Sequence, residues 1–103
     1  MHYLINDKID TLKKLCEQYD VQAMYLFGSA VENKNNNNSD SDIDILVSFK
    51  DISVEQYTDN YFNLHNKLEE LFGRKIDLVT QNSLKNPYFI QQVNDTKELL
   101  YAA

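Results

Sequence analysis

The apolar residues of this chain recur three and four positions apart in two stretches, which is the spacing of one buried helix face. The first stretch, residues 4–19, predicts a helix whose apolar members are Ile5, Ile9, Leu12, Cys16 and Tyr19. The second begins after Ser53, which forms a capping-box pattern with Gln56, and Gly73 predicts its end. Its apolar members are Val54, Tyr57, Tyr61, Leu64, Leu68 and Leu71.

Shorter apolar segments predict β-strands at residues 22–28, 42–49 and 75–80. Side chains alternate between the two faces of a strand. In the second segment, the members expected on the buried face are Ile43, Ile45, Val47 and Phe49. A short third helix is expected to follow Asn86-Pro87, because proline suits the first helical position.

The order of these elements is helix, strand, loop, strand, helix, strand and helix, followed by residues 98–102 as an edge strand or a final turn. This order predicts an α/β (α+β) sandwich, with a small mixed sheet of three to four strands and helices mainly on one face. With 103 residues, the chain is expected to form a single domain over residues 1–103.

The overall charge narrows the possible partners. Ten Lys and Arg residues stand against sixteen Asp and Glu residues, giving a net charge of −6. General nucleic-acid binding depends on cationic side chains, so no stable binding of this kind is expected. No apolar run approaches the roughly 20 residues of a membrane helix, and the N-terminus lacks a signal-peptide pattern. A single cysteine excludes intramolecular disulfides, and a cytoplasmic location is expected.

Three acidic residues at strand positions are the candidates for chemistry. Asp42 and Asp44 lie two apart, point to the same face, and repel each other unless a cation lies between them. Asp77 lies within the apolar strand 75–80, where an acid is costly unless it is paired or binds a metal. A divalent cation is the usual solution for such carboxylates. The plain alternative is that all three are solvated acids at strand ends.

The pair Gly28-Ser29 ends the first strand and, taken alone, is an ordinary turn. A glycine also lets the backbone lie close to a ligand, and a serine offers a hydroxyl. Together with the three acids, this turn suits phosphoryl chemistry in which carboxylates hold Mg²⁺ against a polyphosphate. It is not a P-loop, because the sequence has no G-x-x-x-x-G-K-[ST] pattern.

The motifs Gly28-Ser29, Asp42-Ile43-Asp44 and Ile76-Asp77-Leu78 resemble the signature of the minimal nucleotidyltransferases of the DNA polymerase beta-like superfamily. The likeness covers nearly the whole chain in element order. The resemblance implies that Gly28 and Ser29 hold the triphosphate of ATP and that Asp42 and Asp44 bind Mg²⁺. It further implies that Asp77 completes the metal site and helps to deprotonate the attacking hydroxyl.

The resemblance also suggests a partner. Larger nucleotidyltransferases add a domain that holds the acceptor, and 103 residues leave no room for one, so the acceptor is expected to be another protein. Such minimal proteins are similar to antitoxins of HEPN–nucleotidyltransferase toxin–antitoxin pairs, which implies transfer of AMP to a tyrosine of a HEPN toxin. Glu32 stands where many members have arginine. A second function therefore stays open: a non-catalytic antitoxin that neutralises its partner by binding alone.

Phe62, His65 and Phe72 lie on a second face of the long helix. This face is either a broad core contact or a partner-binding patch, and His65 is expected to be structural. The asparagine-rich run 33–39 predicts a loop and is assigned no chemistry.

Overall fold

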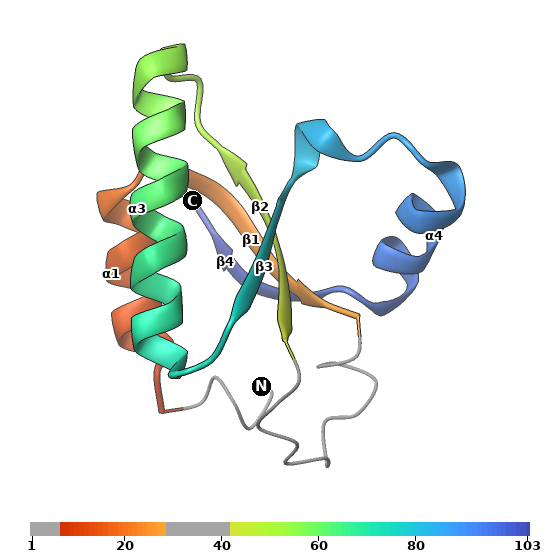
Figure 1. The fold of residues 1–103 in the computed structure, drawn as a ribbon, viewed down its shortest axis with the longest axis horizontal. Helices are drawn as coiled ribbons and strands as arrows, with labels where there is room; N and C mark the ends of the chain where they lie inside the picture. Colours follow the sequence, from red (N-terminus) through yellow and green to blue (C-terminus); the bar gives the residue numbers. More distant parts are fainter. Residues whose placement is uncertain (1–6, 29–41) are drawn as a thin grey trace.

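The computed structural model describes residues 7–28 and 42–103, which form a four-stranded sheet flanked by helices (Figure 1). In chain order the elements are α1 (Ile9–Gln18), β1 (Val21–Phe27), β2 (Ile43–Phe49), α3 (Val54–Phe72), β3 (Ile76–Thr80), η1 (Gln81–Ser83), α4 (Pro87–Thr96) and β4 (Glu98–Ala102). The predicted order of elements is confirmed. So is the edge-strand alternative for residues 98–102.

The sheet is mixed, with the strand order β3-β2-β1-β4. β1 pairs antiparallel with both β2 and β4, whereas β2 and β3 run parallel. The pairing of β2 with β3 sets Asp44 directly opposite Asp77, and the pairing of β1 with β2 sets Phe27 opposite Asp44. Residues far apart in the sequence therefore meet at one end of the two central strands.

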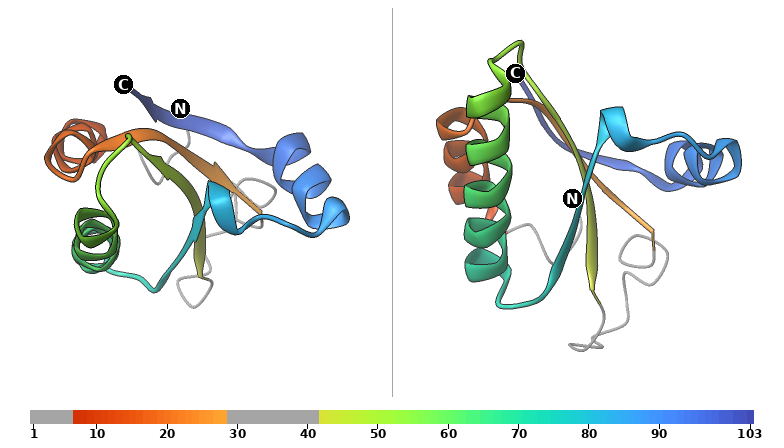
Figure 2. Two further views of the ribbon diagram at one scale, coloured as in Figure 1. Left: turned by 90° about the horizontal axis from the view of Figure 1, so that it is seen from above. Right: turned by 45° about the horizontal axis from the view of Figure 1, so that its top comes forward.

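The main core lies between the sheet and the helices α1 and α3, which lie side by side on one face (Figure 2). Side chains alternate between the two faces of β2 and β3, and the apolar residues of each strand face these helices. Its fully or nearly fully buried strand members are Ile43, Ile45, Val47, Ile76 and Leu78. Leu12 and Cys16 of α1 and Leu64 and Leu68 of α3 are buried against them, so Cys16 is a core residue as expected.

The second face of the sheet carries a smaller apolar cluster under α4, which lies on the opposite side from α1 and α3 (Figure 2). Phe27, Leu46 and Val93 are its buried members. The ring of Phe89 meets that of Phe27 edge-to-face, with centroids 5.9 Å apart. Helices thus cover mainly one face, and α4 covers part of the other.

The predicted helix caps are confirmed. The backbone N–H of Gln56 donates to the Ser53 hydroxyl at 3.2 Å, and Gly73 ends α3 in the left-handed conformation. The Asn86 side chain accepts from the backbone N–H of Tyr88 at 2.9 Å, one residue past Pro87. Within the described chain, no helix is long and apolar enough to cross a membrane.

Two expectations for the helices were wrong. α1 begins at Ile9, because residues 7 and 8 form a turn, and Leu4 and Ile5 lie outside the described residues. Val54 is 81% exposed although its spacing assigns it to the buried stripe of α3. The fully buried residues Leu64 and Leu68 lie further along the helix, so only its middle packs deeply against the sheet.

This packing gives a direct test on one helix. Replacing Leu64, which is fully buried, by alanine should lower the free energy of unfolding by about 2–5 kcal/mol through lost burial and a residual cavity. Val54→Ala, on the exposed first turn, should change it by less than about 0.5 kcal/mol. Urea unfolding of the two variants measures both effects, and similar losses would contradict the observed depth of packing.

Candidate active site

The candidate site is centred on two carboxylates that the sheet register places side by side. Asp44 is the second residue of β2, and its direct partner on β3 is Asp77. Both side chains point to the face that carries Leu46 and Val79, away from α1 and α3. Like charges directly opposite each other on paired strands destabilise a sheet, so this arrangement is unfavourable without a compensating charge.

The pKa of the Asp44 carboxyl is raised, first by burial and then by the neighbouring acids. Partial burial, the charges of Asp77 and Asp42, and a side-chain hydrogen bond with Asp77 raise the pKa of the Asp44 carboxyl from 3.8 to about 6. A hydrogen bond between two carboxyl groups requires a proton on one of them. Below this raised pKa, a proton on Asp44 relieves the repulsion that a bound cation would otherwise relieve.

Gly28 completes the immediate surroundings of Asp44. Its φ is +72°, a conformation that glycine adopts without strain, and its backbone lies against the Asp44 side chain. A Cβ at position 28 would collide with Oδ2 of Asp44. The predicted strand 22–28 therefore ends at Phe27, and Gly28 makes the turn. Ser29, the second predicted phosphate-binding residue, lies outside the described residues.

The other predicted acids have different surroundings. Asp42 is exposed and lies one residue before β2, which begins at Ile43, yet its charge contributes to the raised pKa of Asp44. Asp77 is exposed rather than enclosed by the apolar residues of β3, because its side chain faces an open part of the sheet. The expectation that burial makes Asp77 costly was therefore wrong.

Within residues 7–28 and 42–103, no three His, Cys, Asp or Glu side chains converge closely enough to hold a metal ion together. The structure brings Asp44 and Asp77 together as a pair, with Asp42 near enough to act on Asp44 electrostatically. Carboxylate oxygens are hard ligands suited to Mg²⁺, which commonly binds through one or two carboxylates and keeps several waters. The residues present therefore fit a divalent cation held by a carboxylate pair.

Thr96 belongs to this site and was missed by the sequence analysis. The backbone N–H of Gly28 donates to the Thr96 hydroxyl over a long 3.4 Å, linking the end of α4 to the glycine turn. Lys97 follows directly, with its ammonium 4.7 Å from the centre of the Tyr25 ring. No local pattern marks these residues, because their position depends on how α4 packs against β1.

Asp77 is exposed and Asp44 is half-buried. A hollow of about 290 Å³ lies at the opposite ends of β2 and β3, and its lining includes Phe49, Lys50, Tyr57 and Thr80. Asp44 and Asp77 lie at the beginnings of the same strands. The carboxylate pair and this hollow are thus separate features of the sheet.

The chain matches one family model and several named relatives. Residues 10–103 match the family model described as "Polymerase beta, Nucleotidyltransferase". A protein of Methanocaldococcus jannaschii, named as a candidate protein adenylyltransferase, is 36% identical over 94% of this chain and 96% of its own length. A second such protein from the same organism is 34% identical over 86% of this chain and 84% of its own length.

Solved structures share the fold. A minimal nucleotidyltransferase superposes with a TM-score of 0.73 at 24% identity, covering 91% of this chain and 90% of its own. A toxin–antitoxin structure with AMP-PNP matches with a TM-score of 0.67 at 26% identity, covering 93% and 74%. A complex of a tri-AMPylated Shewanella oneidensis HEPN toxin with MNT antitoxin matches with a TM-score of 0.60 at 26% identity, covering 92% and 70%.

The raised pKa predicts an unusual pH dependence of stability for the metal-free protein. Between pH 4 and pH 6 the folded state binds a proton at Asp44 more tightly than the unfolded state, so stability falls as pH rises through this window. Asp44→Asn removes the penalty and should stabilise the protein at pH 7 by about 1–2 kcal/mol, after allowance for solvent screening. The gain should vanish below pH 4.

Chemical denaturation in EDTA at several pH values measures this difference. Asp51→Asn is the matched control, because Asp51 is an exposed acid beyond the other end of β2. It should leave the pH dependence of the wild type in place. Equal stability of Asp44→Asn and wild type at pH 7 would show that the two carboxylates do not oppose each other.

Proposed function

The chain belongs to the polymerase beta nucleotidyltransferase family, and from this premise we propose that it transfers AMP from ATP to a hydroxyl of a partner protein. The names of its relatives in Methanocaldococcus jannaschii support protein as the acceptor class. The observation that carries the proposal is the direct pairing of Asp44 with Asp77 beside the Gly28 backbone. Two adjacent carboxylates can hold a divalent cation, and such a cation neutralises the charge of a bound polyphosphate.

Each candidate residue has a role in this proposal. Asp44 and Asp77 hold Mg²⁺, with Asp42 contributing from the chain just before β2. Gly28 and Ser29 bind the triphosphate, since a turn without a Cβ at position 28 lets backbone N–H groups approach the phosphates. When bound, Mg²⁺ neutralises negative charge on the triphosphate.

The reaction is a substitution at the α-phosphorus of ATP. The acceptor oxygen forms a bond to this phosphorus, the bond from phosphorus to the oxygen that bridges to the β-phosphate breaks, and pyrophosphate leaves with the electron pair. The proton of the acceptor hydroxyl passes to the carboxylate of Asp77. Asp77 suits this role because it is exposed, so an acceptor side chain can reach it.

The structural relatives support a particular partner and nucleotide. A structure at 26% identity contains a tri-AMPylated HEPN toxin with MNT antitoxin, and another at 26% identity is a toxin–antitoxin with AMP-PNP. We therefore propose a HEPN-type toxin as the acceptor, with a tyrosine as the modified residue, and ATP as the donor.

Transfer of label tests this function. The protein is incubated with Mg²⁺, ATP labelled at the α-phosphate and the product of the neighbouring gene, and label should appear on a tyrosine of that product. Asp44→Asn and Asp77→Asn should each lower the initial rate by on the order of 10²–10³-fold, as expected for lost electrostatic stabilisation. Asp51→Asn should keep the wild-type rate. A stable complex without label would favour the non-catalytic antitoxin.

The two glycines of the chain provide a second, matched test. Both adopt positive φ, +72° at Gly28 and +62° at Gly73, so the backbone strain of alanine should cost about 1 kcal/mol at either position, before any clash is added. Only at Gly28 does the added methyl meet a functional group, the Asp44 carboxylate, whereas a Cβ at Gly73 has nothing within 4 Å. Gly28→Ala should therefore lose labelling activity and Gly73→Ala should retain it. Equal activity of the two variants would remove Gly28 from the site.

A further inference from the structure

Among the strands of residues 7–28 and 42–103, β3 lies at an edge of the sheet, and β2 is its one strand neighbour. The backbone N–H of Ile43 in β2 donates to the carbonyl of Lys75 at 3.1 Å, just before β3 begins. Backbone groups alternate in direction along a parallel strand, so Ile76 and Leu78 turn theirs away from β2. These groups face α3, and they flank Asp77 on both sides.

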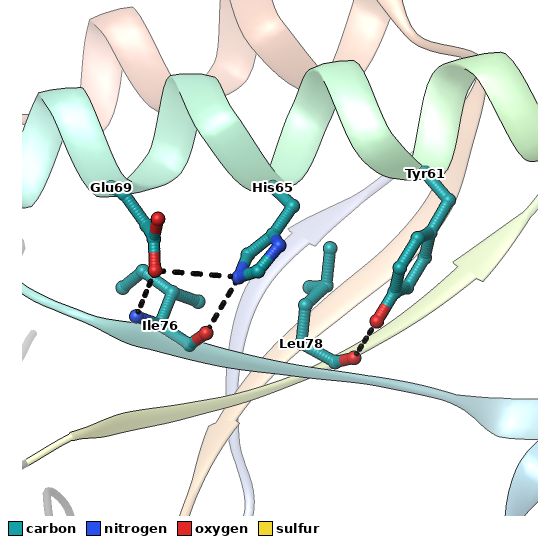
Figure 3. A network of polar contacts seen from close by, with 5 residues as sticks. All are labelled: Tyr61, His65, Glu69, Ile76 and Leu78. Atoms are coloured by element: carbon teal, nitrogen blue, oxygen red, sulfur yellow. Dashed lines mark hydrogen bonds and ion pairs between the residues drawn. The ribbon is translucent and has the colours of Figure 1, made fainter.

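Three side chains of α3 meet this outer edge (Figure 3). Tyr61, His65 and Glu69 are four residues apart and therefore lie on one helix face. The Tyr61 hydroxyl donates to the carbonyl of Leu78 at 2.6 Å. Nε2 of His65 lies 2.7 Å from the carbonyl of Ile76, and the backbone N–H of Ile76 donates to Oε2 of Glu69 at 3.0 Å. We call these three residues the edge clamp.

The contacts define the state of His65. A carbonyl oxygen can only accept a hydrogen bond, so Nε2 of His65 must carry the proton that Ile76 accepts. The same Nε2 is 3.4 Å from Oε2 of Glu69, and this carboxylate favours a proton on the nitrogen. Each member of the edge clamp thus has a distinct and compatible partner on β3.

The edge clamp surrounds the backbone of Asp77 without using its side chain. β3 has five residues and, among the described residues, a strand neighbour on one side only, so the edge clamp adds to the burial of Ile76 and Leu78 in fixing its register on β2. A shift of one residue would turn the Asp77 side chain to the opposite face of the sheet. Tyr61 of the edge clamp is also close enough to Asp77 to feel its charge. Burial raises the pKa of Tyr61, and the negative charge of Asp77 raises it further.

Covering an exposed edge is a common way to prevent pairing with other chains, and any polar or bulky side chains could do it. Here all three hydrogen bonds from the edge clamp to β3 fall on Ile76 and Leu78, the two residues next to Asp77. We propose that Tyr61, His65 and Glu69 are positioning residues that hold Asp77 opposite Asp44 and thereby set the affinity of this carboxylate pair for a divalent cation. The inference rests on the metal site of the proposed function.

The affinity of the protein for Mn²⁺ alone provides the test, because Mn²⁺ accepts the same oxygen ligands and free Mn²⁺ is measured directly by its EPR signal. Tyr61→Phe removes one hydroxyl and should weaken Mn²⁺ binding about tenfold, the lower range for residues that orient metal ligands. Tyr57→Phe is the matched control one turn earlier on α3, because the Tyr57 hydroxyl makes no hydrogen bond to residues 7–28 or 42–103. It should bind within twofold of wild type.

A second pair of variants tests His65. His65→Met removes the donor and should weaken Mn²⁺ binding, whereas His65→Gln places an amide N–H near the position of Nε2 and should restore most of the affinity. All variants are measured at a temperature where circular dichroism shows them folded. Leu64→Ala, which loses core packing on the same helix, should keep the Mn²⁺ affinity despite its lower stability.

The outcomes separate this inference from the proposed function. Asp77→Asn should abolish the binding that the wild type shows. If Asp77→Asn loses Mn²⁺ while Tyr61→Phe and His65→Met bind like wild type, the edge clamp is only structural and the inference is overturned. If Asp77→Asn binds like wild type, or the wild type takes up no Mn²⁺, the metal site is overturned together with the inference.

Discussion

The register between β2 and β3 sets two carboxylates against each other, and much of the structure serves to maintain that unfavourable pairing. Parallel pairing puts Asp44 directly opposite Asp77, and the same register buries Ile43 with Ile76 and Ile45 with Leu78 on the other face. The apolar burial stabilises the strands by far more than the screened repulsion destabilises them. The acids can therefore be held together without unfolding the sheet.

One face of the sheet holds the main core, and the other face carries the two carboxylates. α1 and α3 cover the apolar face that holds the main core, whereas α4 covers only part of the other face, near Phe27 and Leu46. Asp77 stays exposed and Asp44 only half-buried as a result. The same placement of α4 brings Thr96 to the backbone of Gly28, so a helix near the end of the chain helps to shape the turn beside the acids.

Local patterns were sufficient to predict most elements and to single out Asp44 and Asp77 as candidate residues. Ser53, Gly73 and Asn86 act on the backbone beside them, and their capping roles could be inferred from short stretches. The direct contact of Asp44 with Asp77 could not, because it depends on which strands pair and in which register. Thr96 and the exposure of Val54 were missed for the same reason, since both depend on helix packing.

The second face of α3 shows how one helical spacing can contain separate functions. Phe62 is 60% exposed, Phe72 packs against the core, and His65 binds the backbone of β3, so the predicted group of three is not one surface. The coherent set is Tyr61, His65 and Glu69, which holds the strand that carries Asp77. Opposed acids lower stability on their own, so the proposed metal site and the proposed role of the edge clamp depend on one another: the clamp has a use only where the two carboxylates must stay opposed to bind a cation.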